Sequence, residues 1–289
     1  MSALRTFACT CFAVAALSGL QLTRQSPASA EELVKFDSAG PRRHQVEEHF
    51  ARNGGKIAKS MPGAPIQGYL TKPNGHGPFP AVVLLHSCLG LPATRRSIAD
   101  VFAGWGYVAL FVDDFTTRGV KETCAEDFGE GLSDAFGALR YLSRRPFVDP
   151  KRIAAVGYSQ GADTALKIAS SRFVSAFEVP DEVKFKVAAA FYPPCDNLGN
   201  VKLAIPTLIL IGELDDVTPA ADCTRLAKNQ WGDSSNLKLV VYPGAYHGFD
   251  NPEFADALRA SGMLLKYDRD AAERSRSEMR DFLATKLAR

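Results

Sequence analysis

Patterns of buried strands alternate with amphipathic helical segments along most of the chain, and this alternation constrains the fold more than any other feature. Residues 80–86 form a continuous apolar run, which is typical of a strand buried on both faces. Similar runs predict strands at 107–112, 153–157, 186–192, 207–212 and 237–242, and amphipathic segments predict helices at 94–104, 129–145, 161–170, 219–231 and 270–287. Strands separated by such helices imply right-handed crossovers, so we expect an α/β protein with a mostly parallel sheet and helices on both faces.

Two shorter strands are expected before this series, at 45–50 and 65–71, which brings the sheet to eight strands. No linker rich in proline, glycine or serine divides the 289 residues, so one domain is the economical interpretation. The hydrophobic residues, 46% of the chain, exclude a disordered protein. With 34 basic residues against 32 acidic ones, the chain lacks the basic excess typical of proteins that bind nucleic acid.

The first 30 residues have the pattern of a secretory signal peptide. Arg5 is followed by an apolar run at 7–22, and the small residues at 28–30 suit signal peptidase. The apolar run is shorter than the ~20 residues that a membrane-spanning helix needs. We therefore expect cleavage after residue 30 and a single exported domain at 31–289, periplasmic or secreted in a bacterium. The alternative is an uncleaved membrane anchor; after cleavage we expect no stable membrane insertion.

The segment Gly157-Tyr158-Ser159-Gln160-Gly161 matches G-x-S-x-G and lies between a predicted buried strand and a predicted helix, a context that makes the motif informative. The two glycines allow a sharp turn that presents the Ser159 hydroxyl at the carboxyl end of the strand. The backbone N–H of Gln160 then faces an oxyanion that forms on a bound carbonyl. We predict Ser159 as a nucleophile and Gln160 as an oxyanion-hole donor; the alternative is that Ser159 is an ordinary helix N-cap.

A serine nucleophile needs a base that accepts its proton and a carboxylate that orients the base. Only one histidine, His247, follows Ser159 in the sequence, and it lies on a loop after the last predicted strand. The acid is expected after the strand at 207–212. We favour Asp215 by its spacing from that strand, with Asp216 as the alternative. The order Ser, Asp, His is that of α/β-hydrolases.

A second oxyanion-hole donor is expected from the loop at 86–90, directly after a buried strand. The backbone N–H of Cys88 is the candidate. His86 is then expected to be a structural residue at the end of the strand rather than a second base.

From about residue 60 to its C-terminus, the chain resembles the dienelactone hydrolase family of the α/β-hydrolase superfamily. The resemblance rests on the His-x-x-x-Gly loop at 86–90, on 148–153 leading into the G-x-S-x-G segment, on Asp215 with Pro219, and on His247-Gly248-Phe249. It implies the α/β-hydrolase fold, with a mostly parallel eight-stranded sheet.

Two positions depart from the prototype members of that family, which use a cysteine nucleophile and carry a glutamate where this chain has Ser87. With Ser159 in place of the thiol, the resemblance implies a serine-esterase mechanism that needs no metal and no organic cofactor. Ser159 attacks an ester or lactone carbonyl, His247 takes its proton, Asp215 orients the imidazole, and water releases the acyl group.

Four cysteines remain after the predicted cleavage, and disulfides persist in exported proteins. In the α/β-hydrolase sheet, the strand before Cys88 neighbours the strand before Cys124, and the strands before Cys195 and Cys223 are also neighbours. The pairs Cys88–Cys124 and Cys195–Cys223 are therefore the easiest of the three connectivities. The alternative is four buried free thiols. A zinc site is poorly supported, because no two of these cysteines have C-x₂₋₄-C spacing.

The segments 171–186 and 193–206, where this superfamily commonly inserts lids, are short, which favours an open pocket and a small-molecule ester or lactone substrate. Arg118 is a candidate partner for a substrate carboxylate, and the alternative is a solvated loop arginine. The candidate apolar walls, each of which could instead belong to the core, are Phe115, Tyr158, Tyr192 and Phe249.

Two other functions are compatible with the same motifs. One is a peptidase or amidase of the prolyl-oligopeptidase type, which normally carries a large additional domain for which this chain has no room. The other is a non-catalytic binding protein on a hydrolase scaffold, which the intact set of Ser159, Asp215 and His247 argues against.

Overall fold

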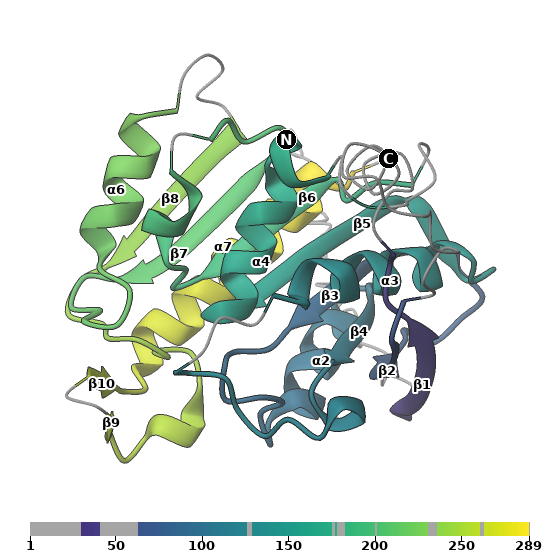
Figure 1. Ribbon diagram of the computed structural model, residues 1–289, viewed down its shortest axis with the longest axis horizontal. Coiled ribbons are helices and arrows are strands. Elements are labelled where there is room, and N and C mark those ends of the chain that lie inside the picture. The colour runs from purple at the N-terminus through teal and green to yellow at the C-terminus, as the bar shows by residue number, and fades with distance from the viewer. Residues whose placement is uncertain are drawn as a thin grey trace, which may run out of the picture.

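The structure is a computed structural model that describes residues 30–40, 63–125, 129–174, 177, 183–199, 201–230, 236–260 and 263–288. Eight strands form one sheet in the order β1-β2-β4-β3-β5-β6-β7-β8 (Figure 1). The strands are β1 (Glu32–Asp37), β2 (Pro65–Thr71), β3 (Phe79–Leu85), β4 (Val108–Asp113), β5 (Val148–Tyr158), β6 (Val187–Phe191), β7 (Thr207–Gly212) and β8 (Leu237–Tyr242).

The sheet is parallel over most of its width. The pairs from β4 through β3 and β5 to β8 are parallel, whereas β2 pairs antiparallel with both β1 and β4. In β3 and β5 the central residues, 81–84 and 153–156, are fully buried. The continuous apolar runs therefore correspond to strands covered on both faces, as predicted.

The described residues contain five longer helices, of which the first four connect strands and the fifth follows the last strand. They are α2 (Arg95–Gly104), α3 (Gly131–Ser143), α4 (Gln160–Ala169), α6 (Ala220–Lys228) and α7 (Arg269–Lys286). Figure 1 shows α3 and α4 in front of the sheet and α7 passing behind it. Successive residues of β3 enter different hydrophobic clusters: Val82 packs with residues of α2 and α7, and Val83 with residues of α3. The sheet therefore has a core on each face, and this confirms the predicted α/β-hydrolase architecture.

The structure contains elements that were not expected. The strand expected at 45–50 lies outside the described residues, and β1, which was not expected, forms one edge of the sheet. Only Val34 is buried in this six-residue strand, so its sequence carries a weak signal. A separate pair of three-residue strands, β9 (Leu258–Ala260) and β10 (Met263–Leu265), was also not expected.

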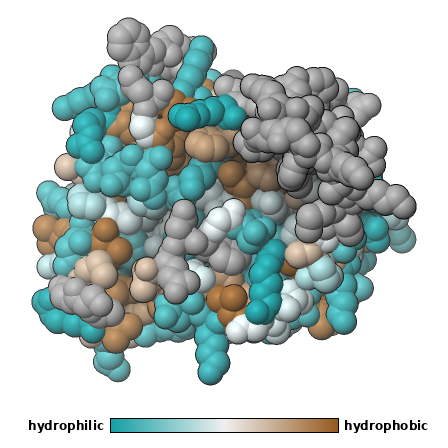
Figure 2. All heavy atoms as spheres, viewed as in Figure 1, coloured by the Kyte–Doolittle hydropathy of each residue, from teal (hydrophilic) through white to brown (hydrophobic). Residues whose placement is uncertain are grey.

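The carboxyl ends of the parallel strands lie along one edge of the sheet, which is where α/β folds place their sites. The residues that directly follow β3, β5 and β6 are His86, Ser159 and Tyr192. In the face of the molecule that Figure 2 shows, hydrophilic side chains predominate and apolar ones gather in small groups. No helix in the described part of the chain has the length and apolar character needed to cross a membrane.

Candidate active site

The G-x-S-x-G segment forms a sharp turn between β5 and α4. Ser159 has φ 53° and ψ −112°, a backbone conformation that residues with a side chain rarely adopt. A Cβ atom at Gly157 would lie 2.0 Å from the carbonyl oxygen of Gly161, and one at Gly161 would lie 2.3 Å from the carbonyl oxygen of Leu85. Because only glycine fits at both positions, the turn can close and present the Ser159 hydroxyl at the edge of the sheet.

A chain of two hydrogen bonds joins the three predicted triad residues. Ser159 Oγ lies 3.0 Å from His247 Nε2, and His247 Nδ1 lies 2.9 Å from Asp215 Oδ2. The His247 and Asp215 side chains are buried, whereas Ser159 is half-buried. A proton on Nδ1 bonded to the carboxylate leaves Nε2 free to accept the serine proton, so the arrangement can activate Ser159 as a nucleophile.

Asp215, not Asp216, is the acid that contacts His247. Its Oδ1 accepts hydrogen bonds from the backbone N–H groups of Val217 at 3.0 Å and Thr218 at 2.8 Å, and its Oδ2 lies 3.1 Å from the Thr218 hydroxyl. Asp216 instead accepts a hydrogen bond at 2.9 Å from the backbone N–H of Leu264, in β10. The two neighbouring acids therefore have separate tasks.

The segment at 123–124 contacts both predicted oxyanion-hole residues. The Thr123 N–H donates to the Cys88 carbonyl oxygen at 2.9 Å, and the Thr123 hydroxyl donates to Gln160 Oε1 at 3.0 Å. Cys88 is also disulfide-bonded to Cys124. One short segment thus fixes the loop after β3 relative to the first residue of α4.

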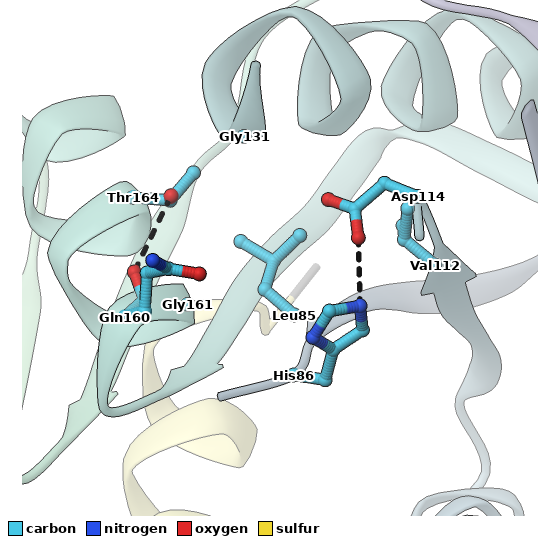
Figure 3. A pocket seen from close by; sticks show the side chains of 8 residues that line it. All are labelled: Leu85, His86, Val112, Asp114, Gly131, Gln160, Gly161 and Thr164. Atoms are coloured by element: carbon cyan, nitrogen blue, oxygen red, sulfur yellow. Dashed lines mark hydrogen bonds and ion pairs between the residues drawn. The ribbon is translucent and has the colours of Figure 1, made fainter. Parts of the chain in front are cut away.

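His86, expected to be structural, makes two close polar contacts beside this segment. Its Nε2 lies 2.6 Å from Asp114 Oδ1, and its Nδ1 lies 2.7 Å from the carbonyl oxygen of Ser87. Figure 3 shows His86 and Asp114 on one side of a small cavity and Gln160 and Thr164 on the other. The cavity has room for about one water molecule.

Arg118 is engaged in a buried ion pair rather than open to a substrate carboxylate. Its guanidinium donates to both carboxylate oxygens of Asp134, at 3.0 Å and 2.9 Å, and to the backbone carbonyl oxygen of Asp114 at 2.6 Å. Burial raises the pKa of Asp134 to about 6, and the hydrogen bonds from Arg118 and Ser38 oppose this rise. Both sequence interpretations of Arg118, as substrate ligand and as solvated residue, are therefore corrected. The sequence alone did not show that Asp134 lies beside it.

The four aromatic residues proposed as pocket walls, Phe115, Tyr158, Tyr192 and Phe249, are all buried, and the last three belong to one hydrophobic core cluster. Tyr158 stacks on Phe191, with ring centroids 4.9 Å apart. Tyr192 supports the histidine: its ring centroid lies 4.5 Å from that of His247, and its backbone carbonyl oxygen lies 3.1 Å from the Thr218 hydroxyl. Its φ of 43° is strained for an aromatic residue, which is a feature common near functional sites.

The Tyr192 hydroxyl donates to Asp250 Oδ1 at 2.8 Å. Burial raises the pKa of Asp250 to about 6, although this hydrogen bond and the charge of His247 act against the rise. Burial, with Asp250 beside it, raises the pKa of the Tyr192 hydroxyl as well. Besides the hydrogen bond between His247 and Asp215, a second polar pair, Tyr192 and Asp250, thus lies next to the loop that carries His247.

The second pair of cysteines, Cys195 and Cys223, is also disulfide-bonded and joins the loop after β6 to α6. Among the described residues, no group of three or more histidine, cysteine, aspartate or glutamate side chains could hold a metal ion.

Sequence reasoning missed Asp114, Thr218 and Asp250. Asp114 had a detectable signal, because it follows the buried strand that neighbours the strand before His86, and the carboxyl ends of parallel neighbours meet. Thr218 and Asp250 carried none, since their contacts depend on how two loops pack against each other.

Comparison with known proteins places this site in a family. The model of the dienelactone hydrolase family matches residues 66–287. Protein usf from Aquifex pyrophilus is 23% identical over 209 residues, which cover 67% of this chain and 86% of that protein.

Two solved structures share the fold. A dienelactone hydrolase-like promiscuous phosphotriesterase from metagenomic libraries superposes with a TM-score of 0.63 at 18% identity, over 89% of this chain and 99% of that one. A thermophilic esterase from the planctomycete Thermogutta terrifontis superposes with a TM-score of 0.58 at 18% identity, over 87% of this chain and 95% of that one. Because the family model spans most of the sequence, including the three triad positions, the chain belongs to the dienelactone hydrolase family.

Proposed function

We propose that this protein is a serine hydrolase that cleaves small carboxylic esters or lactones through an acyl-enzyme on Ser159. The observation that carries the proposal is the chain of hydrogen bonds from Ser159 Oγ to His247 Nε2 and from His247 Nδ1 to Asp215, 3.0 Å and 2.9 Å long. Membership of the dienelactone hydrolase family supports the same reaction class.

Acylation follows from this geometry. As Ser159 Oγ attacks the carbonyl carbon, its proton moves to His247 Nε2, and Asp215 stabilises the imidazolium that results. The negative charge moves to the carbonyl oxygen, which accepts hydrogen bonds from the backbone N–H groups of Cys88 and Gln160. His247 then gives its proton to the leaving alkoxide, and the C–O bond breaks.

Deacylation repeats these steps with water as the nucleophile. His247 takes a proton from the attacking water, and the tetrahedral intermediate collapses to release the acid and regenerate the Ser159 hydroxyl. All proton transfers use one imidazole, so the reaction requires no metal or organic cofactor.

The short segments beside the site favour a small substrate. In the described part of 193–206, the chain forms only a four-residue 3₁₀ helix (Cys195–Leu198), which is too short to act as a lid. The fold neighbours include an esterase whose structure holds propionate, a short carboxylate. Esters with short acyl chains are therefore the first substrates to test.

The test is a Ser159→Ala variant assayed with p-nitrophenyl acetate, p-nitrophenyl butyrate and simple lactones. We expect kcat to fall by about 10⁴- to 10⁶-fold, because the triad acts as a unit. A fluorophosphonate probe is expected to label the native enzyme and not the variant. Ser143→Ala, at the end of α3 and away from the site, is the matched control. Turnover close to native in Ser159→Ala would refute the proposal, and cleavage of peptide substrates alone would favour an amidase.

We further propose that the protein is exported, to the periplasm or the exterior, after removal of residues 1–30 as a signal peptide. Two disulfides support an oxidising compartment, because disulfides are rare where thiols are kept reduced. The first strand, β1, begins at Glu32, so cleavage after residue 30 would leave the sheet intact.

A further inference from the structure

Each ring nitrogen of His86 lies close to an oxygen atom that can accept a hydrogen bond. Asp114 Oδ1 lies 2.6 Å from Nε2, and the Ser87 carbonyl oxygen lies 2.7 Å from Nδ1. A carboxylate and a backbone carbonyl carry no hydrogen to donate. Nδ1 therefore donates to Ser87, and the 2.6 Å ion pair with Asp114 favours a proton on Nε2 as well, which makes the ring an imidazolium.

The surroundings of His86 favour the charged ring. The residue is 6% exposed, and its ring packs against that of Phe115 in a T-shaped arrangement with centroids 4.5 Å apart. Burial lowers the pKa of His86, but the hydrogen bond and the charge of Asp114 outweigh it, with smaller help from Ser87 and Asp113, so the pKa is raised. Across the cavity the facing side chains, Gln160 and Thr164, are uncharged (Figure 3).

One more cation lies nearby. Arg118 is bound to Asp134 and to the backbone carbonyl oxygen of Asp114, while Asp114 Oδ1 lies 2.6 Å from His86 Nε2. The charged groups that act on His86 are thus the carboxylates of Asp114 and, more weakly, Asp113, and Arg118 interacts with the Asp114 charge as well.

The acceptor of the Nδ1 hydrogen bond belongs to the peptide unit that carries the proposed oxyanion donor. The carbonyl oxygen of Ser87 and the N–H of Cys88 are two ends of one planar amide and point in opposite directions. The same oxygen accepts a second hydrogen bond, from the Gly90 N–H at 3.0 Å. With its oxygen held by two donors, the amide cannot rotate, and the direction of the Cys88 N–H is fixed.

A charged donor on the carbonyl also polarises the amide. Hydrogen bonds to ionised groups are stronger than neutral ones, and bonds in series strengthen each other. The Cys88 N–H therefore becomes a better donor when His86 is charged.

We propose that His86, held as an imidazolium by Asp114, is a positioning residue that aims the Cys88 N–H at the oxyanion and strengthens it as a donor. The inference rests on the proposed function, since it assigns His86 a task in that reaction. It predicts that kcat for ester hydrolysis falls at alkaline pH. A group with a raised pKa keeps its charge up to that pKa, so the loss comes above the ordinary imidazole value of about 6.5.

The test compares the pH profiles of kcat for short-chain ester hydrolysis in four proteins. In His86→Gln, which cannot titrate, we expect the alkaline decrease to disappear, and kcat near neutral pH to be about 10- to 100-fold lower, less than the roughly 100- to 1000-fold that loss of a whole donor costs. KM is expected to change by less than about threefold, because the oxyanion forms only in the transition state.

Asp114→Asn keeps the shape of the pair and removes its negative charge, so the alkaline decrease is expected to move to lower pH. His76→Gln, on an exposed loop, is the control and is expected to keep the native profile. Thermal unfolding of each variant shows whether it is folded before its profile is interpreted.

A measurement independent of activity accompanies these profiles. In ¹⁵N-edited NMR spectra of the native enzyme, we expect two ring N–H signals from His86, both absent in His86→Gln. A single ring N–H signal, or an alkaline decrease unchanged in His86→Gln while Ser159→Ala is inactive, would overturn the inference and leave the proposed function standing. Absence of ester hydrolysis in the native protein would overturn both the inference and the proposed function. The activity of the native protein therefore separates failure of the proposed function from failure of the inference about His86.

Discussion

The strained backbone at Ser159 shows that the residue that reacts and the residues that allow its conformation are different. Its φ and ψ lie outside the regions that residues with side chains prefer, a cost of about 1–3 kcal/mol that the surrounding packing must offset. Gly157 and Gly161 make this possible because each lets a backbone oxygen approach where a Cβ atom would clash. The nucleophile is therefore held by residues that take no part in the reaction.

The two neighbouring acids after β7 offer a sharp test at this scale. Asp215→Asn should lower kcat by about 10⁴-fold, because the amide would favour the wrong tautomer of His247. Asp216→Asn is the matched control: it keeps an oxygen that can accept from the Leu264 N–H, so kcat should stay within about twofold. Steady-state kinetics on a p-nitrophenyl ester measures both. A larger loss in Asp216→Asn than in Asp215→Asn would reverse the assignment.

At the scale of elements, both disulfides should stabilise the fold, but only one of them should also affect catalysis. They close loops of similar length, with sequence separations of 36 and 28, so each is expected to contribute about 4 kcal/mol of stability by restricting the unfolded chain. Only the Cys88–Cys124 bond holds a segment that carries a predicted oxyanion donor.

We therefore compare two double variants, Cys88→Ala/Cys124→Ala and Cys195→Ala/Cys223→Ala. Both should lower the melting temperature by similar amounts, but only the first should lower kcat, by roughly 10- to 100-fold, because small displacements of catalytic groups are costly. Calorimetry and ester hydrolysis below both melting temperatures give the two readouts. Equal kcat values in the two variants would show that the first bond serves stability alone.

The strands and helices that position the site could be predicted, because their signals are local. Buried strands such as β3 and β5 are continuous apolar runs, and the glycines at 157 and 161 mark the turn between strand and helix. In contrast, β1 has one buried residue, and β9 and β10 have three residues each, so they depend on pairing rather than on their own pattern. The same limit applies to Arg118, because its pairing with Asp134, 16 residues further along in α3, depends on how that helix packs.

At the scale of the whole molecule, the edge strand ties the start of the described chain to the body of the protein. The Ser38 hydroxyl bonds to Asp134, the Ala39 N–H donates to the Ser133 carbonyl oxygen at 2.8 Å, and Arg140 donates to the carbonyl oxygens of residues 37 and 38. These contacts lie on α3, next to the Arg118 ion pair. Residues 31–39 are therefore part of the folded domain.

Two truncations test this boundary. A protein that starts at Glu31 should unfold at the temperature of the protein purified after export. One that starts at Gly40 should melt about 10 °C lower, because it loses β1 and leaves the buried Asp134 with one partner fewer. Equal melting temperatures for the two truncations would exclude a structural role for β1. N-terminal sequencing of the exported protein should begin at Glu31, and an intact Met1 would refute cleavage.

The order of the cysteines has a consequence for biosynthesis. Among Cys88, Cys124, Cys195 and Cys223, each disulfide joins one cysteine to the next along the chain, and the two loops do not overlap. A chain that crosses a membrane from its N-terminus delivers Cys88 and Cys124 to the oxidising side before Cys195 arrives. An oxidase that joins thiols in their order of arrival would then produce the native pairing directly, so we expect maturation to depend on an oxidase and to proceed without a disulfide isomerase.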